Sequence, residues 1–240
     1  MKWYPLESNP ASLTSYVGEL GLCTDLFALH DVLSIESWAI SMIPKPVLAV
    51  VFLYPLTPTQ EEHRKKEKVE KVALTVEEAR EKGVWFTKQR IGNACGTIGA
   101  LHALANIDRN FIIRGSWMDS FLQMSAYSVF GEECDDVFVK RAELLEGDKA
   151  VSVLHEKATS NHENSTNRGN IDDKVLTHFI TFTVVGGVLY ELDGRKDGPI
   201  PHGPSSEENL LDDSCAAIKR FMDRADPGEL RFTILALAGK

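Results

Sequence analysis

Helical spacing of apolar residues marks the first element of the chain. Asn9 can cap a helix, Pro10 suits the first helical position, and Gly21 suits the end. Between them the apolar residues fall on one helical face. They are Leu13, Tyr16, Val17 and Leu20. The pattern predicts an amphipathic helix over residues 10–20.

A continuous apolar run follows at residues 47–54. This run lies between Pro46 and Pro55, is rich in β-branched residues and is too short for a typical core helix, so it predicts a buried strand. Residues 57–82 instead carry many charges of both signs. Such a stretch is usually a solvated helix or a mobile segment, and we assign it no chemistry.

Further along the chain, helical patterns alternate with one very polar stretch. Helices are expected from residue 95 to about residue 147. Residues 157–170 contain a single alanine as their only apolar side chain, which predicts a long exposed loop. A last helix carries an apolar face, and Ser205 and Glu208 have the spacing of a capping box at its start.

Two strand-like runs flank a Gly-Gly pair at residues 186–187 and predict a β-hairpin. If the loop has two residues, His178 lies opposite Arg195, and Asp193 becomes its diagonal neighbour on the same face. A slip of one residue would put the imidazole and the carboxylate on opposite faces. The hairpin therefore predicts that His178 and Asp193 meet.

A cysteine stands where the helix after residue 93 is expected to begin. With Asn93 as the N-cap, Cys95 falls in the first turn, where unpaired N–H groups and the helix dipole lower a thiol pKa. Gln89 can supply a side-chain N–H, beside the Cys95 backbone N–H, to an oxygen that becomes negative during acyl transfer. Glycines at positions 92, 96 and 99 let other parts of the backbone approach. Cys95 is thus the candidate nucleophile.

Asp193 would fix the tautomer of His178, whose free nitrogen could deprotonate Cys95 and later protonate a leaving amine. Each residue alone has an ordinary explanation. A buried cysteine is usually structural, a loop glutamine is usually solvated, and Asp-Gly is a common turn. All four residues together, in settings that suit one catalytic site, are rarer than any of them alone. We interpret the remaining cysteines as structural and the remaining histidines as surface or core residues.

Composition narrows the class of protein. The chain has 240 residues, of which 43% are hydrophobic, so we expect one domain over residues 1–240 with a substantial core. Scattered cysteines and an N-terminus unlike a signal peptide favour the cytoplasm, and we allow for the nucleus as an additional location. No metal-binding spacing is present, so we expect no metal or cofactor. A net charge of -9 argues against nucleic acid or membrane partners and favours a basic partner. A monomer is the default expectation.

At this point three stretches establish a resemblance to a known family. They are Asn93-Ala-Cys-Gly-Thr-Ile-Gly99, Leu176-Thr-His-Phe-Ile180 and Leu189-Tyr-Glu-Leu-Asp-Gly-Arg-Lys196. They resemble the signatures of ubiquitin carboxyl-terminal hydrolases, and both ends of the chain also resemble that family. The resemblance implies that Cys95 is the nucleophile, His178 the general base and acid, Asp193 the orienting carboxylate and Gln89 the oxyanion-hole donor.

The resemblance also implies an α+β fold similar to papain-like cysteine proteases, with a central antiparallel sheet between helical layers and a knotted backbone. A loop over about residues 152–170 would cross the active site and limit leaving groups to small adducts or flexible peptides. Ubiquitin contacts are expected near both ends of the chain, although the same leucines could be core and the glutamates solvated. These contact residues are Pro5, Leu6, Glu7, Glu229 and Leu230.

We therefore expect a deubiquitinating thiol hydrolase that cleaves after the terminal glycine of ubiquitin through an acyl-enzyme. One alternative keeps this chemistry but prefers a ubiquitin-like modifier. A second alternative is a ubiquitin-binding module that turns over little. Hydrolysis and binding assays separate the three.

Overall fold

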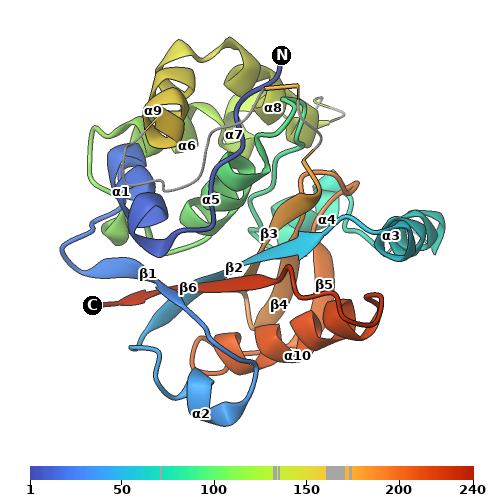
Figure 1. The fold of residues 1–240 in the computed structure, drawn as a ribbon. Helices are drawn as coiled ribbons and strands as arrows, with labels where there is room; N and C mark the ends of the chain where they lie inside the picture. The colour runs from blue at the N-terminus through green and yellow to red at the C-terminus, as the bar shows by residue number, and fades with distance from the viewer. Residues whose placement is uncertain (71, 132–133, 135, 161–170, 173–174) are drawn as a thin grey trace.

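The fold is built around an antiparallel sheet (Figure 1). The computed structural model describes residues 1–240 except 71, 132–133, 135, 161–170 and 173–174. Within the described residues the sheet has six strands in the order β1-β6-β2-β3-β4-β5. The strands are β1 (Phe27–Asp31), β2 (Val47–Pro55), β3 (Thr177–Val185), β4 (Val188–Leu192), β5 (Ile200–Pro204) and β6 (Thr233–Gly239). The last strand in the chain therefore lies between the first two.

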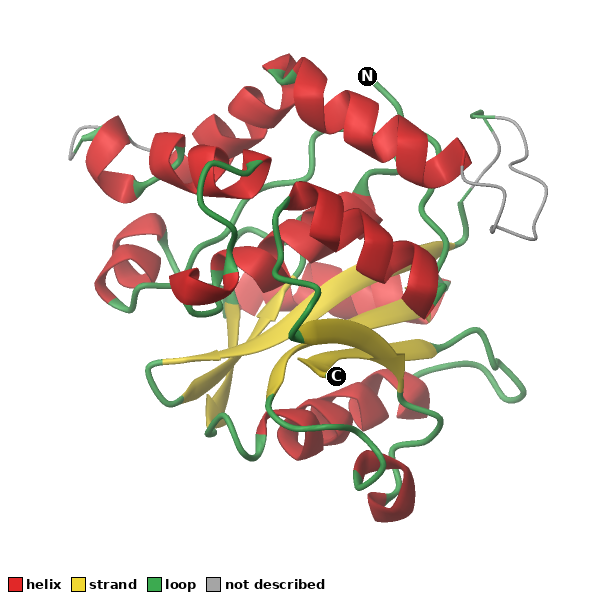
Figure 2. Cartoon of the chain, turned by 90° about the vertical axis from the view of Figure 1, so that its left-hand side faces the viewer, coloured by secondary structure: helices red, strands yellow, loops and turns green. Residues whose placement is uncertain are grey.

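Helices cover both faces of this sheet, as Figures 1 and 2 show. They are α1 (Pro10–Leu20), α2 (Ser37–Ile40), α3 (Pro58–Glu70), α4 (Val76–Glu81), α5 (Cys95–Ala105), α6 (Trp117–Met124), α7 (Tyr127–Phe130), α8 (Val137–Gly147), α9 (Lys149–Ser160) and α10 (Leu210–Asp223), with a 3₁₀ turn at Arg109–Phe111. The α5 side carries most of them, and α10 and α2 lie on the other side. None of the helices in the described part is long and apolar enough to cross a bilayer.

Side chains that alternate between the two faces of the sheet form two layers of the hydrophobic core, one on each face. Val51 and Phe179 belong to the apolar cluster on the α5 side, whereas Phe52 and Ile180 belong to the cluster that includes α10. Successive strand residues point to opposite faces, so a continuous apolar run buries both sides of the sheet. This arrangement confirms the α+β fold with helical layers on both sides of an antiparallel sheet.

Two of the predicted elements form as the sequence indicated. The Asn9 side chain accepts a hydrogen bond from the backbone N–H of Ser12 at 3.0 Å and caps α1. In the hairpin, Val185 pairs with Val188, so the loop has two residues and the register is the predicted one. Both glycines of that loop have positive φ, which a side chain would disfavour.

Two other predicted caps are wrong. Ala94, not Asn93, is the N-cap of α5, because Asn93 adopts φ 60° and its side-chain amide donates to the Trp3 carbonyl. Asparagine tolerates this left-handed conformation. The capping box at Ser205 and Glu208 is also absent, since α10 begins at Leu210 and the Ser205 hydroxyl instead donates to Asp213.

The first part of the loop expected over about residues 152–170 is helical instead. Helix α9 continues to Ser160, with Val151, His155 and Thr159 buried at helical spacing. The remainder of that prediction, at residues 161–170, lies outside the described residues. The knotted backbone also stays a prediction, because the path of the whole backbone cannot be followed through residues 161–170.

Candidate active site

Cys95 is the first residue of α5, and its side chain is buried. Small residues let this helix end pack closely. A Cβ added to Gly96 would lie 2.9 Å from the Leu6 Cβ, and one added to Gly99 would lie 3.4 Å from the Thr181 hydroxyl oxygen. That hydroxyl donates to the Gly99 carbonyl at 2.8 Å. The glycines thus seat α5 against the N-terminal segment and β3, as the sequence predicted.

His178, near the start of β3, meets Asp193, which directly follows β4. Its Nε2 lies 2.6 Å from the Asp193 Oδ1, and both side chains are buried. The hairpin register produces this contact, because β3 and β4 place the two residues diagonally across adjacent strands. The predicted imidazole–carboxylate pair is therefore present.

The thiol and the imidazole influence each other's protonation. Burial would raise the pKa of the Cys95 thiol, but its hydrogen bond with His178, the charge of that ring and backbone N–H groups lower it overall. Burial would lower the pKa of His178, but the charge and hydrogen bond of the Asp193 carboxylate raise it. Cys95 makes a smaller contribution in the same direction, and the pKa reaches about 9. Both directions favour a thiolate beside an imidazolium at neutral pH.

Asp193 stays ionised in this setting. Burial would raise the pKa of its carboxyl group, but the charge and hydrogen bond of His178, together with Lys196, hold it well below the usual range. The Arg195 backbone N–H donates to Asp193 Oδ1 at 2.9 Å. The same carboxylate oxygen therefore accepts from the imidazole and from the following turn.

Gln89 lies against the residue that follows Asp193. Its backbone N–H donates to the Gly194 carbonyl at 2.8 Å, and its side-chain Nε2 donates to the Ile91 carbonyl at 3.2 Å. Its Oε1 is buried and has no hydrogen-bond partner among the described residues. The structure thus brings Gln89 to the same turn as the carboxylate.

The predicted ubiquitin contacts fall in two different environments. Leu6 is 8% exposed and lies against Gly96, whereas Leu230 is 86% exposed. The Glu229 side chain binds Arg231. Pro5 and Glu7 are partly exposed. Burial makes Leu6 a residue that seats α5, while Leu230 is free to meet a partner.

Sequence reasoning missed two residues on the charged helix α3. Glu61 pairs with Arg195, and Glu67 pairs with Lys196, so this helix contacts the turn that follows Asp193. Each of these carboxylates is more than a hundred residues away in the sequence from the cation it binds; Glu61 and Arg195 are 134 residues apart. No local pattern within α3 distinguishes these carboxylates from their solvated neighbours.

Comparison with known families matches residues 3–223 to ubiquitin carboxyl-terminal hydrolase, family 1. "Ubiquitin carboxyl-terminal hydrolase 3" of Arabidopsis thaliana is 39% identical over 238 residues, which is 99% of this chain and 94% of that protein. A Drosophila melanogaster ubiquitin carboxyl-terminal hydrolase is 40% identical over 237 residues, covering 99% and 97% respectively. Similarity therefore extends over nearly the whole length of both partners in each comparison.

Solved structures show the same fold. The catalytic domain of Trichinella spiralis UCH37, bound to ubiquitin vinyl methyl ester, superposes with a TM-score of 0.73 at 22% identity and covers 100% of this chain and 96% of that chain. Fold and relatives together define a cysteine-type hydrolase with papain-like architecture. The chain belongs to the ubiquitin carboxyl-terminal hydrolase family, whose members are deubiquitinating thiol hydrolases.

Proposed function

We propose that this hydrolase cleaves bonds to the C-terminal glycine of ubiquitin, with Cys95 as nucleophile, His178 as general base and acid, and Asp193 as orienting carboxylate. One observation carries the proposal. His178 Nε2 is held 2.6 Å from Asp193, which leaves Nδ1 for the thiol, and the pKa of that thiol is lowered. This is the protonation pattern that a nucleophilic cysteine needs.

In the acylation step, the Cys95 thiolate attacks the carbonyl carbon of the terminal glycine. The carbonyl oxygen becomes negative, and the Cys95 backbone N–H and the Gln89 amide stabilise it. The imidazolium of His178 gives its proton to the leaving amine as the carbon–nitrogen bond breaks. A thioester between Cys95 and ubiquitin remains.

In the deacylation step, neutral His178 removes a proton from water, and the resulting hydroxide attacks the thioester carbon. The carbon–sulfur bond breaks and Cys95 returns to the thiolate beside imidazolium. Ubiquitin leaves with a free carboxyl group, which releases its proton to water. Asp193 keeps the ring oriented during both transfers and favours its charged form. The reaction needs no cofactor.

Ubiquitin as substrate is supported by the solved relative that binds ubiquitin vinyl methyl ester. The net charge of -9 would also favour a basic partner. Contacts through Pro5, Leu6, Glu7, Glu229 and Leu230 belong to this proposal. The Ser8 hydroxyl donates to Thr233 at 3.4 Å, so the N-terminal contact segment lies close to the start of β6 and to the C-terminal contacts that precede it.

We extend the proposal to the setting of the enzyme. Residues 1–240 would form one catalytic domain that works as a monomer in the cytoplasm or nucleus. Its leaving groups would be small adducts or flexible peptides, because the family resemblance implies a loop over the active site. Comparing a small ubiquitin amide with a folded ubiquitin conjugate tests this size limit.

The decisive experiment measures hydrolysis of ubiquitin that carries a fluorogenic amide at its C-terminus. Wild type, Cys95→Ala and, as a matched control, Cys23→Ala are compared, because Cys23 is a partly exposed free cysteine with no role in the proposed mechanism. Turnover is expected in wild type and Cys23→Ala only, with ubiquitin binding retained in all three. Binding without turnover in folded wild type would favour a sequestering module, and faster cleavage of a ubiquitin-like modifier would reassign the substrate.

A further inference from the structure

The charged helix α3 is fixed in place by its first turn. Gln60 is 4% exposed, and its side-chain amide donates to the Phe221 carbonyl of α10 at 2.7 Å. The Arg224 side chain donates back to the Gln60 side-chain oxygen at 3.2 Å. Because α3 also follows β2 closely in sequence, this helix has a defined position relative to the sheet.

The turn after Asp193 sets the position of the carboxylate. The Arg195 backbone N–H donates to Asp193 Oδ1 at 2.9 Å, and the Lys196 backbone N–H donates to the Asp193 carbonyl at 2.9 Å. The oxygen held by Arg195 is the one that accepts from His178. Movement of Arg195 would therefore change the hydrogen bond that orients the imidazole.

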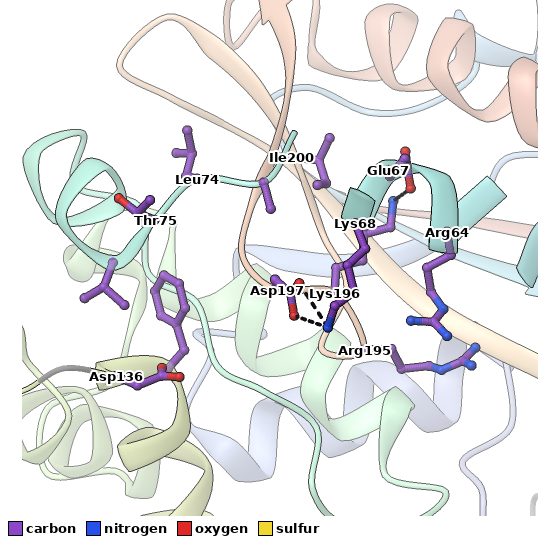
Figure 3. Close-up of a pocket in the computed structure, with 13 residues that line it drawn as sticks. Arg64, Glu67, Lys68, Leu74, Thr75, Asp136, Arg195, Lys196, Asp197 and Ile200 are labelled. Carbon is purple, nitrogen blue, oxygen red and sulfur yellow. Dashed lines mark hydrogen bonds and ion pairs between the residues drawn. The ribbon is translucent and has the colours of Figure 1, made fainter. Parts of the chain in front are cut away.

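Packing alone does not hold the outer side of this turn. Arg195, Lys196 and Asp197 border a cavity of about 290 Å³ whose apolar wall includes Phe138 and Ile200 (Figure 3). A segment beside such a space lacks close neighbours on that side, so it needs other contacts to stay ordered.

Two carboxylates of α3 provide those contacts. Glu61 binds the Arg195 guanidinium through both of its oxygens, at 2.7 and 2.8 Å. Glu67 binds the Lys196 ammonium at 2.7 Å (Figure 3). The same ammonium lies 2.6 Å from Glu191. Bidentate arginine pairs fix geometry better than a single point contact.

These ion pairs differ from ordinary surface pairs in their burial. The Lys196 side chain is 7% exposed and that of Glu191 is 1% exposed, while Arg195 and Glu61 keep 27% and 29%. Removing one partner of such a pair leaves a charge with poor access to water. The contacts therefore constrain the turn more than exposed pairs of equal length would.

We propose that Glu61 and Glu67 are positioning residues of the active site: by holding Arg195 and Lys196, they fix the Asp193 carboxylate that orients His178. The proposal rests on the roles of Cys95, His178 and Asp193 in the proposed function. The opposing possibility is that both ion pairs only stabilise the fold.

The test measures the pH dependence of Cys95 alkylation by iodoacetamide in Glu61→Gln and Glu67→Gln. Glu62→Gln is the matched control, because Glu62 is exposed on the same helix and has no ion pair among those found in the described residues. A misplaced Asp193 stabilises the imidazolium less, so the thiolate forms at higher pH. Alkylation at about pH 6 is expected to slow about three- to tenfold in both variants and to stay at the wild-type rate in the control.

Ubiquitin hydrolysis supplies a second readout. The expected change is a lower kcat with an unaltered KM, since both carboxylates bind side chains of the turn after Asp193 and act on the chemical step in this proposal. In the double variant Glu61→Gln with Arg195→Gln, the loss of kcat, expressed as a free energy, should be smaller than the sum of the losses in the two single variants. Each single change already removes the same ion pair.

Normal alkylation profiles in folded Glu61→Gln and Glu67→Gln, even with a lowered Tm, would overturn the proposal and leave only a structural role. If Glu67→Gln fails to fold because Lys196 remains buried, Glu61→Gln alone decides. Alkylation requires no ubiquitin. A wild type that fails to hydrolyse ubiquitin would therefore refute the proposed function while the positioning test could still be read.

Discussion

Gln89 and Gly194 are in direct contact: the backbone N–H of Gln89 donates to the Gly194 carbonyl at 2.8 Å. A Cβ on Gly194 would lie 2.9 Å from the Gln89 Cβ and 2.9 Å from Ile98 Cγ2. The candidate oxyanion donor and the residue after the orienting carboxylate thus share one tightly packed junction. The absence of a side chain at position 194 is what permits it.

Gly194→Ala should therefore damage both stability and activity. The added methyl group must push Gln89 or Ile98 aside, so we expect unfolding to need about 1–3 kcal/mol less free energy and kcat to fall. Gly147→Ala is the control, because nothing lies within 4 Å of a Cβ built there. Denaturant titration and ubiquitin amide hydrolysis measure the two effects. An unaltered kcat in Gly194→Ala would show that this junction does not position Gln89.

Asp193→Asn should change the pH profile as well as the rate. The carboxylate favours the charged imidazole, and the pKa of His178 is about 9, so an amide lowers that pKa. In the pH profile of kcat, the decline at alkaline pH reports the loss of the proton that His178 must donate. This alkaline limb should move to lower pH, and the maximum kcat should fall about 10²–10⁴-fold. Asp197→Asn provides the comparison, because Asp197 pairs with Lys68 and Lys88 instead of His178. An unmoved alkaline limb would assign that limb to another group.

Gln89→Ala should reduce transition-state stabilisation without changing the nucleophile. Removing one oxyanion donor is expected to lower kcat about 10²–10³-fold. The rate of Cys95 alkylation should stay at its wild-type value, since Gln89 does not set the thiol pKa. Parallel losses of kcat and alkylation would instead show that Gln89 supports the structure around Cys95.

Thr97→Val should test a buried polar network below the active site. The Thr97 hydroxyl lies 2.8 Å from the Tyr16 hydroxyl and 2.8 Å from His155 Nδ1. Replacing it with a methyl group removes both contacts, so the free energy of unfolding should drop by about 1–3 kcal/mol.

Thr183→Val is the matched control for that network. Thr183 is 1% exposed, and its hydroxyl has no hydrogen-bond partner among the described residues, so valine should cost nothing or stabilise. Urea unfolding of both variants gives the difference. Equal effects in Thr97→Val and Thr183→Val would mean that the Thr97 contacts add no net stability.

Local patterns predicted much of the site because the relevant geometry is set locally. A two-residue loop fixes the hairpin register, and that register brings His178 to Asp193. Helix α1 likewise follows from its cap and its apolar stripe. The position of Cys95 at the start of α5 was predicted even though the capping residue was not, because one residue of error still leaves the thiol in the first turn.

The rest depends on contacts between distant segments. Asn93 does not cap α5 because the Trp3 carbonyl, 90 residues away, binds its amide. Glu61 and Glu67 look like solvated charges until the fold brings Arg195 and Lys196 beside them. Similarly, α9 extends to Ser160 because its buried face packs on other elements, which composition alone does not reveal.

The place of β6 in the sheet also bears on how the protein is made. Among the described strands, β1 pairs only with β6, and β6 joins it to β2. A chain still on the ribosome can contain Cys95, His178 and Asp193 while its sheet remains in two unjoined parts. Release before β6 emerges would leave the edges of β1 and β2 unpaired, and such edges recruit other strands. Chains truncated before Thr233 should therefore be substrates for chaperones and proteases before they are enzymes.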